Sequence, residues 1–469
     1  MGQQLDLTDI QANILHSYGH DPGRAAYFLL RFDSPRAGRA LLCDLLPDLT
    51  PATSRRPSAG RTVSITHAGF GALGIRQSLL DGFPQPFREM SRRETAHARA
   101  RSLGDVGASD PTCWEEKSGT GRGQVHAIVD LHATPDEYPG AYRDLEAVLA
   151  KVDDIAVIDV QEAETLRRMV EHFGFADGAS QPAVEGVVRA DDPLVRGGGV
   201  PLRDAGWRPV KPGEFILGYR DEDGAVPDAP DPALVRSGSY VVWRKLRQHV
   251  GAFRARLQAA AEQADLPVEL MAAKTVGRWR DGLPLELDPW RSVTHDLSDD
   301  EVRTPPNDFR YLPHDRAGEI CPRGAHIRRT NPRDAIEFGT AVAETGLLTA
   351  RHRIIRRGMP YGSPLPTEAS DDDGVDRGLI FVCFQADIER QFEVIQRAWC
   401  CDGDAFFLGE DQDFLLGNEN ASGKMVIPVR DGPPRFVTTE PDLVVTRGME
   451  YLFAPGLAAL RGLADGRFS

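Results

Sequence analysis

The feature that most constrains the fold is an alternation of short β-rich segments with helix-like segments in both halves of the chain. Short runs of β-branched and aromatic residues predict strands at 25–32, 124–132 and 155–160, and again at 239–242, 353–356 and 379–384. Apolar residues with helical spacing predict helices at 36–46, 141–152, 250–263 and 387–399. The last of these helices carries an apolar stripe of Ile388, Phe392, Ile395 and Trp399. Strands that alternate with helices favour an α+β fold with helices packed on the sheets.

The chain is long enough for two domains. At 469 residues it exceeds what one hydrophobic core usually supports. The segment DEDGAVPDAPDP, at residues 221–232, has the Asp, Pro and Gly content that is typical of an exposed connector. We therefore expect one domain at residues 1–225 and a second at residues 226–469.

Composition excludes several classes of protein. The formal net charge of -15 disfavours non-specific binding of nucleic acid, and no run of 18 or more apolar residues predicts a membrane span. The opening residues, MGQQLDLTDIQANILHSYGHD, lack the basic and apolar regions of a secretory signal, so we expect a cytoplasmic location. The six cysteines form no C-x-x-C pair, which argues against a zinc ribbon, a redox dithiol and a covalent c-type haem motif.

One histidine stands among unusual neighbours in the segment ICPRGAHIRRTNPRD, at residues 320–334. The small pair Gly324-Ala325 precedes His326, and arginines follow it at positions 328, 329 and 333. A lone histidine is more often a core or surface residue than a ligand. Small residues would nevertheless let a broad ring approach the backbone, and the arginines could neutralise carboxylates such as haem propionates. The segment is therefore a candidate haem site, because a proximal imidazole is one standard ligand of haem iron.

Two further motifs contain candidate polar groups. GFADGASQP, which begins at Gly174, is either a plain turn closed by Asp177 or a turn that holds this carboxylate over a cofactor. RIIRRGMPYG, which begins at Arg353, is either a strand end at a solvated rim or a strand that projects Arg356 into a cleft. A guanidinium that stays cationic is suited to stabilise negative charge on bound oxygen.

Taken in order, GFADG, CPRGAHIRRTNPR, RIIRRGMPYG and GLIFVCFQADIERQF resemble motifs of the dye-decolorizing peroxidases, particularly of their larger bacterial and fungal branch. The resemblance runs from the IQANIL segment at Ile10 to the helix that ends near Trp399. It implies two ferredoxin-like domains, each an antiparallel sheet bearing helices, with noncovalent haem b in a pocket beside the sheets. The first domain would carry Asp177, and the second would carry the proximal histidine and the distal arginine.

The resemblance also implies roles for single residues. His326 matches the proximal ligand of the iron, and Asp413 matches the acid that orients its imidazole. Asp177 matches the distal acid-base residue, and Arg356 its cationic partner, which stabilises the breaking O–O bond. Arg333, in the NPR that follows the histidine, matches the residue that pairs with a propionate. The expected activity is reduction of hydrogen peroxide via a ferryl intermediate.

The distal wall and the electron donors follow from the same resemblance. Leu379 and Phe381 match apolar residues that line the distal face, so bulky dyes would not enter the pocket. Tyr361 and Trp399 are candidates to relay electrons from dyes, phenols or other aromatic donors at the surface, although core packing explains each equally well. Mn(II) and a small reductant are further candidate donors, and the sequence does not indicate an oligomeric state.

Two other classes of function stay open from the sequence. A haem-binding or haem-trafficking protein would need His326 but neither Asp177 nor Arg356. A cofactor-free interaction protein with the same α+β architecture would need none of them. The acidic run Asp371-Asp372-Asp373 could bind a divalent cation, but a solvated loop is the simpler interpretation because the spacing of a calcium loop is absent.

Overall fold

The computed structural model describes residues 4–17, 23–55, 57–178, 180–202, 206–291, 306–336, 346–417, 423–438 and 442–469. Its main strands are β1 (Arg24–Phe32), β2 (Ala59–Thr66), β3 (Ala127–Ala133), β4 (Ile155–Glu164), β7 (Ser239–Gln248), β8 (Ile355–Arg356), β9 (Met359–Tyr361), β10 (Gly378–Gln385) and β13 (Val444–Ala454). Within the described residues these strands form one 9-stranded antiparallel sheet in the order β4-β1-β3-β2-β13-β7-β10-β8, and β9 pairs with β10.

The sheet consists of two units with the same topology. In chain order, β1 to β4 are strands one to four of the first unit, and they lie side by side in the order 4-1-3-2. The second unit repeats this order with β7, β8, β10 and β13. The crossover helices are α2 (Pro35–Leu45) and α7 (Tyr138–Leu149) in the first unit, and α10 (Val250–Ala264) and η6 (Glu389–Cys400) in the second. This is the ferredoxin-like β-α-β-β-α-β arrangement, so the predicted α+β fold is confirmed. The boundary between residues 225 and 226 stays a prediction.

The two units join along a short seam. β13 pairs with β2 only through Leu452–Thr66 and Phe453–Ile65, whereas it pairs with β7 along most of its length. The side chains across the seam are nevertheless well packed, because Phe453 lies against the rings of Phe70 and Tyr240. The sheet is therefore continuous through both units.

Local sequence explains why these elements form. In β1, alternate side chains enter two different cores, with Phe28 on one face of the sheet and Tyr27 on the other, so the strand is an almost unbroken apolar run. The helix α2 begins after Ser34, whose side chain accepts the N–H of Ala37, and Pro35 fits its first turn. The sequence thus shows both that β1 is buried on its two faces and that α2 has an N-terminal cap.

Two predicted elements differ in the structure. The strand expected at 353–356 is limited to Ile355 and Arg356. The helix expected at 387–399 is a π-helix, η6, in which Glu393 N–H donates to Ile388 and Cys401 N–H donates to Gln396. The predicted stripe of Ile388, Phe392, Ile395 and Trp399 is buried as expected. The spacing of the stripe is α-helical and π-helices are rare, so the sequence pattern favoured an α-helix here.

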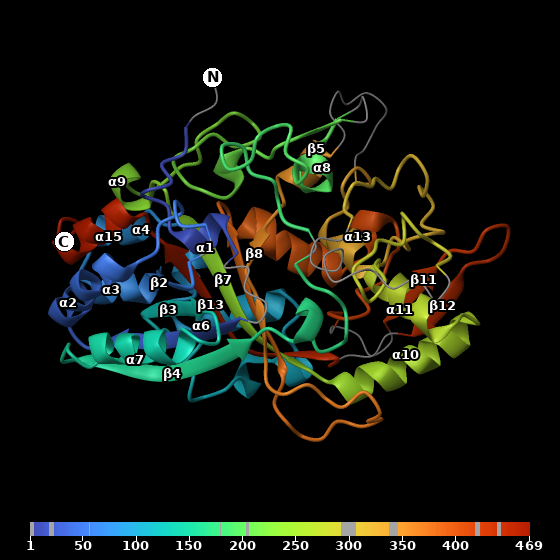
Figure 1. The fold of residues 1–469 in the computed structure, drawn as a ribbon, viewed down its shortest axis with the longest axis horizontal. Helices are drawn as coiled ribbons and strands as arrows, with labels where there is room; N and C mark the ends of the chain where they lie inside the picture. Colours follow the sequence, from blue (N-terminus) through green and yellow to red (C-terminus); the bar gives the residue numbers. More distant parts are fainter. Residues whose placement is uncertain are drawn as a thin grey trace.

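Long segments between the strands of the second unit build a further layer beside the sheet. This layer contains α10, α11 (Val268–Val276), α13 (His326–Thr330), and the hairpin of β11 (Lys424–Ile427) and β12 (Arg435–Thr438). Figure 1 shows it on the opposite side of the molecule from α2, α3 (His67–Ala72) and α15 (Leu457–Ala464). The functional residues proposed from the sequence lie mostly where this layer meets the sheet.

The remaining described elements are short. The helices are α1 (Ala12–Leu15), α4 (Gln77–Asp81), α5 (Gln85–Glu89), α6 (Arg93–Ser102), α8 (Val195–Gly198), α9 (Pro232–Val235) and α14 (Leu347–Ala350), and the paired strands are β5 (Val200–Pro201) and β6 (Trp207–Arg208). The 3₁₀ helices are η1 (Leu46–Asp48), η2 (Gly107–Ser109), η3 (Pro111–Cys113), η4 (Arg167–Met169), η5 (Pro212–Glu214) and η7 (Asp404–Phe406). Among the described helices, none has the length and apolarity needed to span a membrane.

Candidate functional site

A cavity of about 270 Å³ lies between the second unit of the sheet and the layer around α13. Its wall includes six of the residues predicted from the sequence, namely Asp177, His326, Arg333, Arg356, Leu379 and Phe381. These residues come from segments far apart in the chain, so the fold alone brings them together. Apolar side chains of β10, η6 and the segment 415–416 complete much of the wall.

His326 begins α13, and its side chain is 26% exposed, toward the cavity. Its Nδ1 lies 2.8 Å from Oδ2 of Asp413, a fully buried carboxylate. The other oxygen of Asp413 accepts the N–H groups of Leu415 and Leu416 at 2.8 and 3.0 Å. Burial opposes the protonated imidazole, but the charge and hydrogen bond of Asp413 outweigh it and raise the pKa of His326. The carboxylate therefore fixes the ring and leaves Nε2 as the free nitrogen, as in metal-binding histidines.

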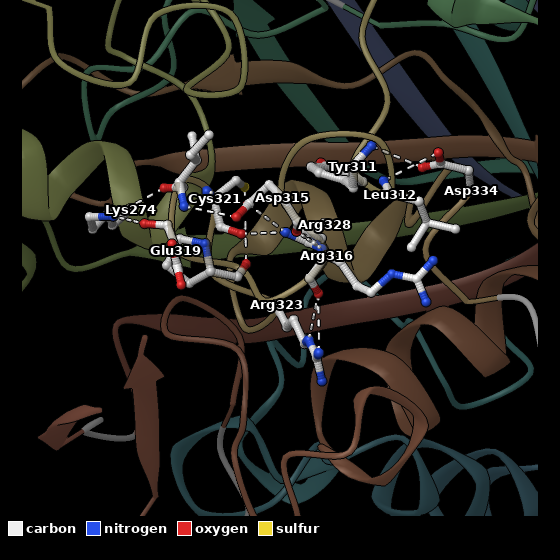
Figure 2. Close-up of polar contacts among 12 residues, drawn as sticks. Lys274, Tyr311, Leu312, Asp315, Arg316, Glu319, Cys321, Arg323, Arg328 and Asp334 are labelled. Carbon is white, nitrogen blue, oxygen red and sulfur yellow. Dashed lines mark hydrogen bonds and ion pairs between the residues drawn. The ribbon is translucent and has the colours of Figure 1, made fainter. Parts of the chain in front are cut away.

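Two of the three arginines after His326 pair with buried carboxylates. Arg328 donates to Asp315 at 2.8 Å (Figure 2), and Arg329 forms a fully buried ion pair with Asp411. Both arginines, which from the sequence could have neutralised carboxylates of a ligand, therefore pair with carboxylates of the chain itself. The small pair before the histidine also lies away from the cavity wall, and a side chain at Gly324 would meet Asp411. These residues pack the loop that presents His326, since buried guanidinium groups need carboxylate partners.

Asp177 and Arg356 form the polar part of the wall. Nη1 of Arg356 lies 3.2 Å from Oδ1 of Asp177, and Nη2 donates to the carbonyl of Ser180. The Gly178 N–H also donates to Oδ1 of Asp177, at 2.6 Å. On the strand side, Gln181 accepts the backbone N–H of Arg356 at 3.0 Å. Both side chains keep about a third of their surface exposed, so the pair is anchored yet accessible from the cavity.

A second carboxylate, missed in the sequence, supports the loop that carries Asp177. Glu171 lines the cavity and accepts the N–H groups of Phe173 and Phe175 at 2.8 and 3.0 Å. It also accepts the side-chain amide of Gln248 at 2.6 Å, which ties the loop to β7. Burial raises the pKa of Glu171 against the effect of these hydrogen bonds. The only signal in the sequence was its place three residues before the GFADG motif.

The alternation of side chains between the two faces of β10 explains the apolar part of the cavity wall. Leu379 and Phe381 are half-buried and line the cavity, whereas their neighbours Ile380 and Val382 are buried in the core of the opposite face. Arg356 enters the same sheet opposite Cys383. Alternation along one strand therefore places these two apolar side chains at the cavity that also contains Arg356.

Buried arginine side chains line the cavity in addition to Arg356. Arg333 is buried and donates to the carbonyls of Asn307 and Phe309 and to the side chain of Asn307. Arg278 and Arg353 are also buried and line the same wall. In the described part of the chain, none of these three arginines has a carboxylate within ion-pair distance. Sequence reasoning singled out only Arg333, since Arg278 and Arg353 are indistinguishable from surface arginines by their local pattern.

The two candidate relay residues lie outside the cavity wall. Tyr361 is 3% exposed, and its hydroxyl donates to Asp376 at 3.2 Å, while Lys245 lies over its ring. Trp399 packs against His352 and other side chains of a small separate core.

The acidic run Asp371-Asp372-Asp373 is engaged in local contacts. Asp372 accepts the N–H of Gly251 at the start of α10, and Asp373 pairs with Arg377. Across the described ranges, no group of three or more His, Cys, Asp or Glu residues could hold a metal ion. The run therefore caps a helix and anchors a loop.

Comparisons with known proteins agree with this architecture. Residues 220–406 match the family described as Dyp-type peroxidase, C-terminal. The chain is 30% identical to Peroxidase 2 of Mycetinis scorodonius, over 97% of this chain and 87% of that protein. It is also 30% identical to a dye-decolorizing peroxidase of Mycena epipterygia, over 98% of this chain and 87% of that protein. The solved structure of an ancestral D-type dye decolorizing peroxidase superposes with a TM-score of 0.78 at 28% identity, covering 98% of this chain and 99% of that one.

Proposed function

This chain belongs to the dye-decolorizing peroxidase family, and from that premise we propose that it binds haem b noncovalently, with His326 as the proximal ligand of the iron. Membership of this family makes the chain a peroxidase, and it supports haem as the cofactor, hydrogen peroxide as the oxidant and dyes as donors. The roles of individual residues are proposals that rest on the geometry of the cavity.

The residues of the cavity fit a haem. Asp413 is bonded to Nδ1 of His326, so the other ring nitrogen, Nε2, is the one that can coordinate iron. Leu379 and Phe381 provide an apolar face, and the buried Arg333 offers positive charge for a propionate. All six cysteines are free thiols, and the one that lines the cavity, Cys400, has a pKa well above its usual value because it is buried. Noncovalent binding through the histidine is therefore the arrangement that this wall supports.

The distal pair supplies acid-base chemistry. A bound haem would provide the iron at which peroxide is reduced and the capacity to store two oxidising equivalents. Asp177 accepts a proton from one oxygen of hydrogen peroxide and returns it to the other oxygen, so that water leaves. Arg356 lies against the same carboxylate and stabilises the negative charge that develops as the O–O bond breaks. Leu379 and Phe381 keep bulk water from competing for these groups.

Tyr361 is the better of the two candidate relays for large donors. Its hydroxyl already donates to Asp376, a half-exposed carboxylate that can take the phenolic proton when the ring is oxidised. Trp399 is enclosed by its own small core and has no comparable acceptor among the described hydrogen bonds. Mn(II) as a donor and a cytoplasmic location stay predictions.

One observation carries the proposal: the ion pair of Asp177 and Arg356 and the imidazole of His326 line one cavity. A haem carrier without turnover would need the imidazole but not the pair. The test is the absorption spectrum of the purified chain before and after one equivalent of hydrogen peroxide, for the wild type and His326→Ala. We expect a Soret band that peroxide changes in the wild type, and lost or altered iron ligation in the variant. A wild-type spectrum that peroxide leaves unchanged would support the carrier, and unchanged ligation in His326→Ala would refute the assignment of the ligand.

A further inference from the structure

The cavity contains a cationic corner, formed by Arg278, Arg333 and Arg353, and we propose that Arg353 binds one carboxylate of the haem there while Arg333 and Arg278 together bind the other. This assignment rests on the proposed function, because it requires a haem in the cavity. It adds two residues to the single arginine that the sequence motif indicated.

Arg353 carries the inference because its side chain lacks a partner in the described part of the chain. The residue is 8% exposed and lines the cavity wall. Its backbone carbonyl accepts the side-chain amide of Gln391 at 2.6 Å, which holds the main chain in place. Its guanidinium, however, makes no hydrogen bond or ion pair with any residue that the structure describes. Five N–H donors are thus left facing a cavity without an acceptor.

Arg278 and Arg333 meet at one acceptor. Nη2 of Arg278 and Nη2 of Arg333 both donate to Oδ1 of Asn307, at 2.8 and 2.6 Å. Phe309 stacks under Arg333, whose Cζ lies 3.7 Å from the ring centroid. Two like charges that share a neutral amide oxygen are held close together without neutralisation. Such a pair is a preformed site for a planar carboxylate.

The charges of the wall do not balance without an anionic ligand. Two of its five arginines are neutralised, Arg244 by Asp105 and Arg356 by Asp177. The three arginines of the cationic corner remain. Among the described residues the one further carboxylate of the wall, Glu171, is satisfied by N–H donors of its own loop and of β7. Burial lowers the pKa of both Arg278 and Arg353 to about 9, so both remain cationic at neutral pH. A surplus of buried positive charge is costly unless an anion compensates it, and haem carries two carboxylates on one edge.

The experiment compares two cofactors in the full-length chain. Wild type, Arg353→Met, Arg353→Lys and the control Arg351→Met are each loaded with haemin or with haemin dimethyl ester, whose carboxylates are uncharged. Arg351 is a suitable control because it pairs with Asp223 and lies outside the cavity wall. The rate of cofactor loss to an excess of a haem-scavenging protein is followed at the Soret band. Melting of the cofactor-free chain is recorded for each variant.

We expect Arg353→Met to accelerate loss of haemin by roughly tenfold to hundredfold, the effect of one lost charge-assisted hydrogen bond at 1.4 kcal/mol per factor of ten. Loss of the dimethyl ester should change little in the same variant, and Arg353→Lys should retain part of the effect of the charge. The cofactor-free Arg353→Met chain should melt at or above the wild-type temperature, because an uncompensated buried cation has been removed.

The remaining outcomes would contradict either the inference about Arg353 or the proposed function. Equal acceleration for haemin and its ester would overturn the inference, because it would mean that Arg353 acts through packing. Unchanged loss of haemin in Arg353→Met, or acceleration as large in Arg351→Met, would overturn it as well. Failure of the wild-type chain to take up either cofactor would instead refute the proposed function.

Discussion

Asp177 and Arg356 are separated by 179 residues in the chain, yet Oδ1 of the one lies 3.2 Å from Nη1 of the other. The carboxylate comes from a turn that follows the first unit, and the guanidinium from the shortest strand of the second unit. Neither side chain is buried as a structural ion pair would be, because each keeps about a third of its surface exposed. An accessible, oriented pair of this kind is suited to chemistry more than to stability.

Asp177→Asn should abolish most turnover and keep the cofactor. The amide can still accept the N–H of Gly178 but cannot take and return a proton. We expect peroxide-dependent dye oxidation to fall by about 10² to 10⁴, the usual contribution of general acid-base catalysis. Steady-state dye oxidation and the Soret band measure the two quantities. Asp371→Asn, in an exposed loop, is the matched control, and comparable losses in both variants would contradict the role of Asp177.

Glu171→Gln should lower turnover without weakening haem binding. One of the two carboxylate oxygens becomes an NH₂ group, which cannot accept the N–H groups that hold the loop. The loop then positions Asp177 less well, and we expect the turnover number to fall by roughly tenfold, since small misplacements are costly. The concentration of a bulky dye that gives half-maximal rate should stay the same. Glu164→Gln, at the exposed end of β4, should change none of these quantities.

Tyr361→Phe should separate large donors from small ones. The substitution removes the hydroxyl that donates to Asp376 and raises the potential needed to oxidise the ring. We expect turnover of a bulky dye to fall several-fold, while reaction with hydrogen peroxide and haem content remain as in the wild type. Stopped-flow spectra with peroxide alone, followed by steady-state rates with the dye, give both readouts. Unchanged dye turnover would remove Tyr361 from the proposed route.

Asp130→Asn should change how stability depends on pH. Burial raises the pKa of Asp130 from 3.8 to about 7, although Asn13 and Thr62 donate to it. The folded chain therefore holds a proton between these pH values that the unfolded chain has released, and the free energy of unfolding falls as pH rises through this range. The loss is on the order of 1.4 kcal/mol for each unit of pKa shift.

The asparagine variant removes this titration. We expect it to unfold at higher denaturant concentration than the wild type at pH 7, and at nearly the same concentration at pH 4, where both side chains are neutral. Its amide can also donate to Oδ1 of Asn13, which in the wild type has no hydrogen-bond partner among the residues that the structure describes. A difference between the two proteins that is the same at both pH values would contradict the assigned pKa.

The sequence predicted the strands well because their residues face cores on both sides or on one side in strict alternation. The resemblance to the family pointed to Leu379 and Phe381, and the alternation along β10 explains why both reach the cavity wall. The roles of Arg328 and Arg329 could not be predicted, because their partners Asp315 and Asp411 lie in other segments. Local pattern does not show which arginines are neutralised by residues far away in the chain.

The same limit explains what was missed at the cavity. Arg353 begins the motif RIIRRGMPYG, but nothing in its neighbours shows that it is buried and that the described residues offer it no acceptor. Glu171 holds the loop by accepting backbone N–H groups, and such contacts cannot be recognised from the residue types in the sequence. Long-range burial and backbone hydrogen bonding, which the fold determines, separate these residues from ordinary surface charges.

The seam between the two units has a consequence for how the molecule opens. Only two residue pairs join β2 to β13, so few backbone hydrogen bonds resist separation there, whereas ten pairs join β13 to β7. Thermal breathing should begin along this line, and amide exchange with deuterium should be faster for the N–H groups that bond across the seam between β2 and β13 than in the middle of β7. The aromatic rings packed over the seam then set the energy of that first opening, more than the sheet itself does.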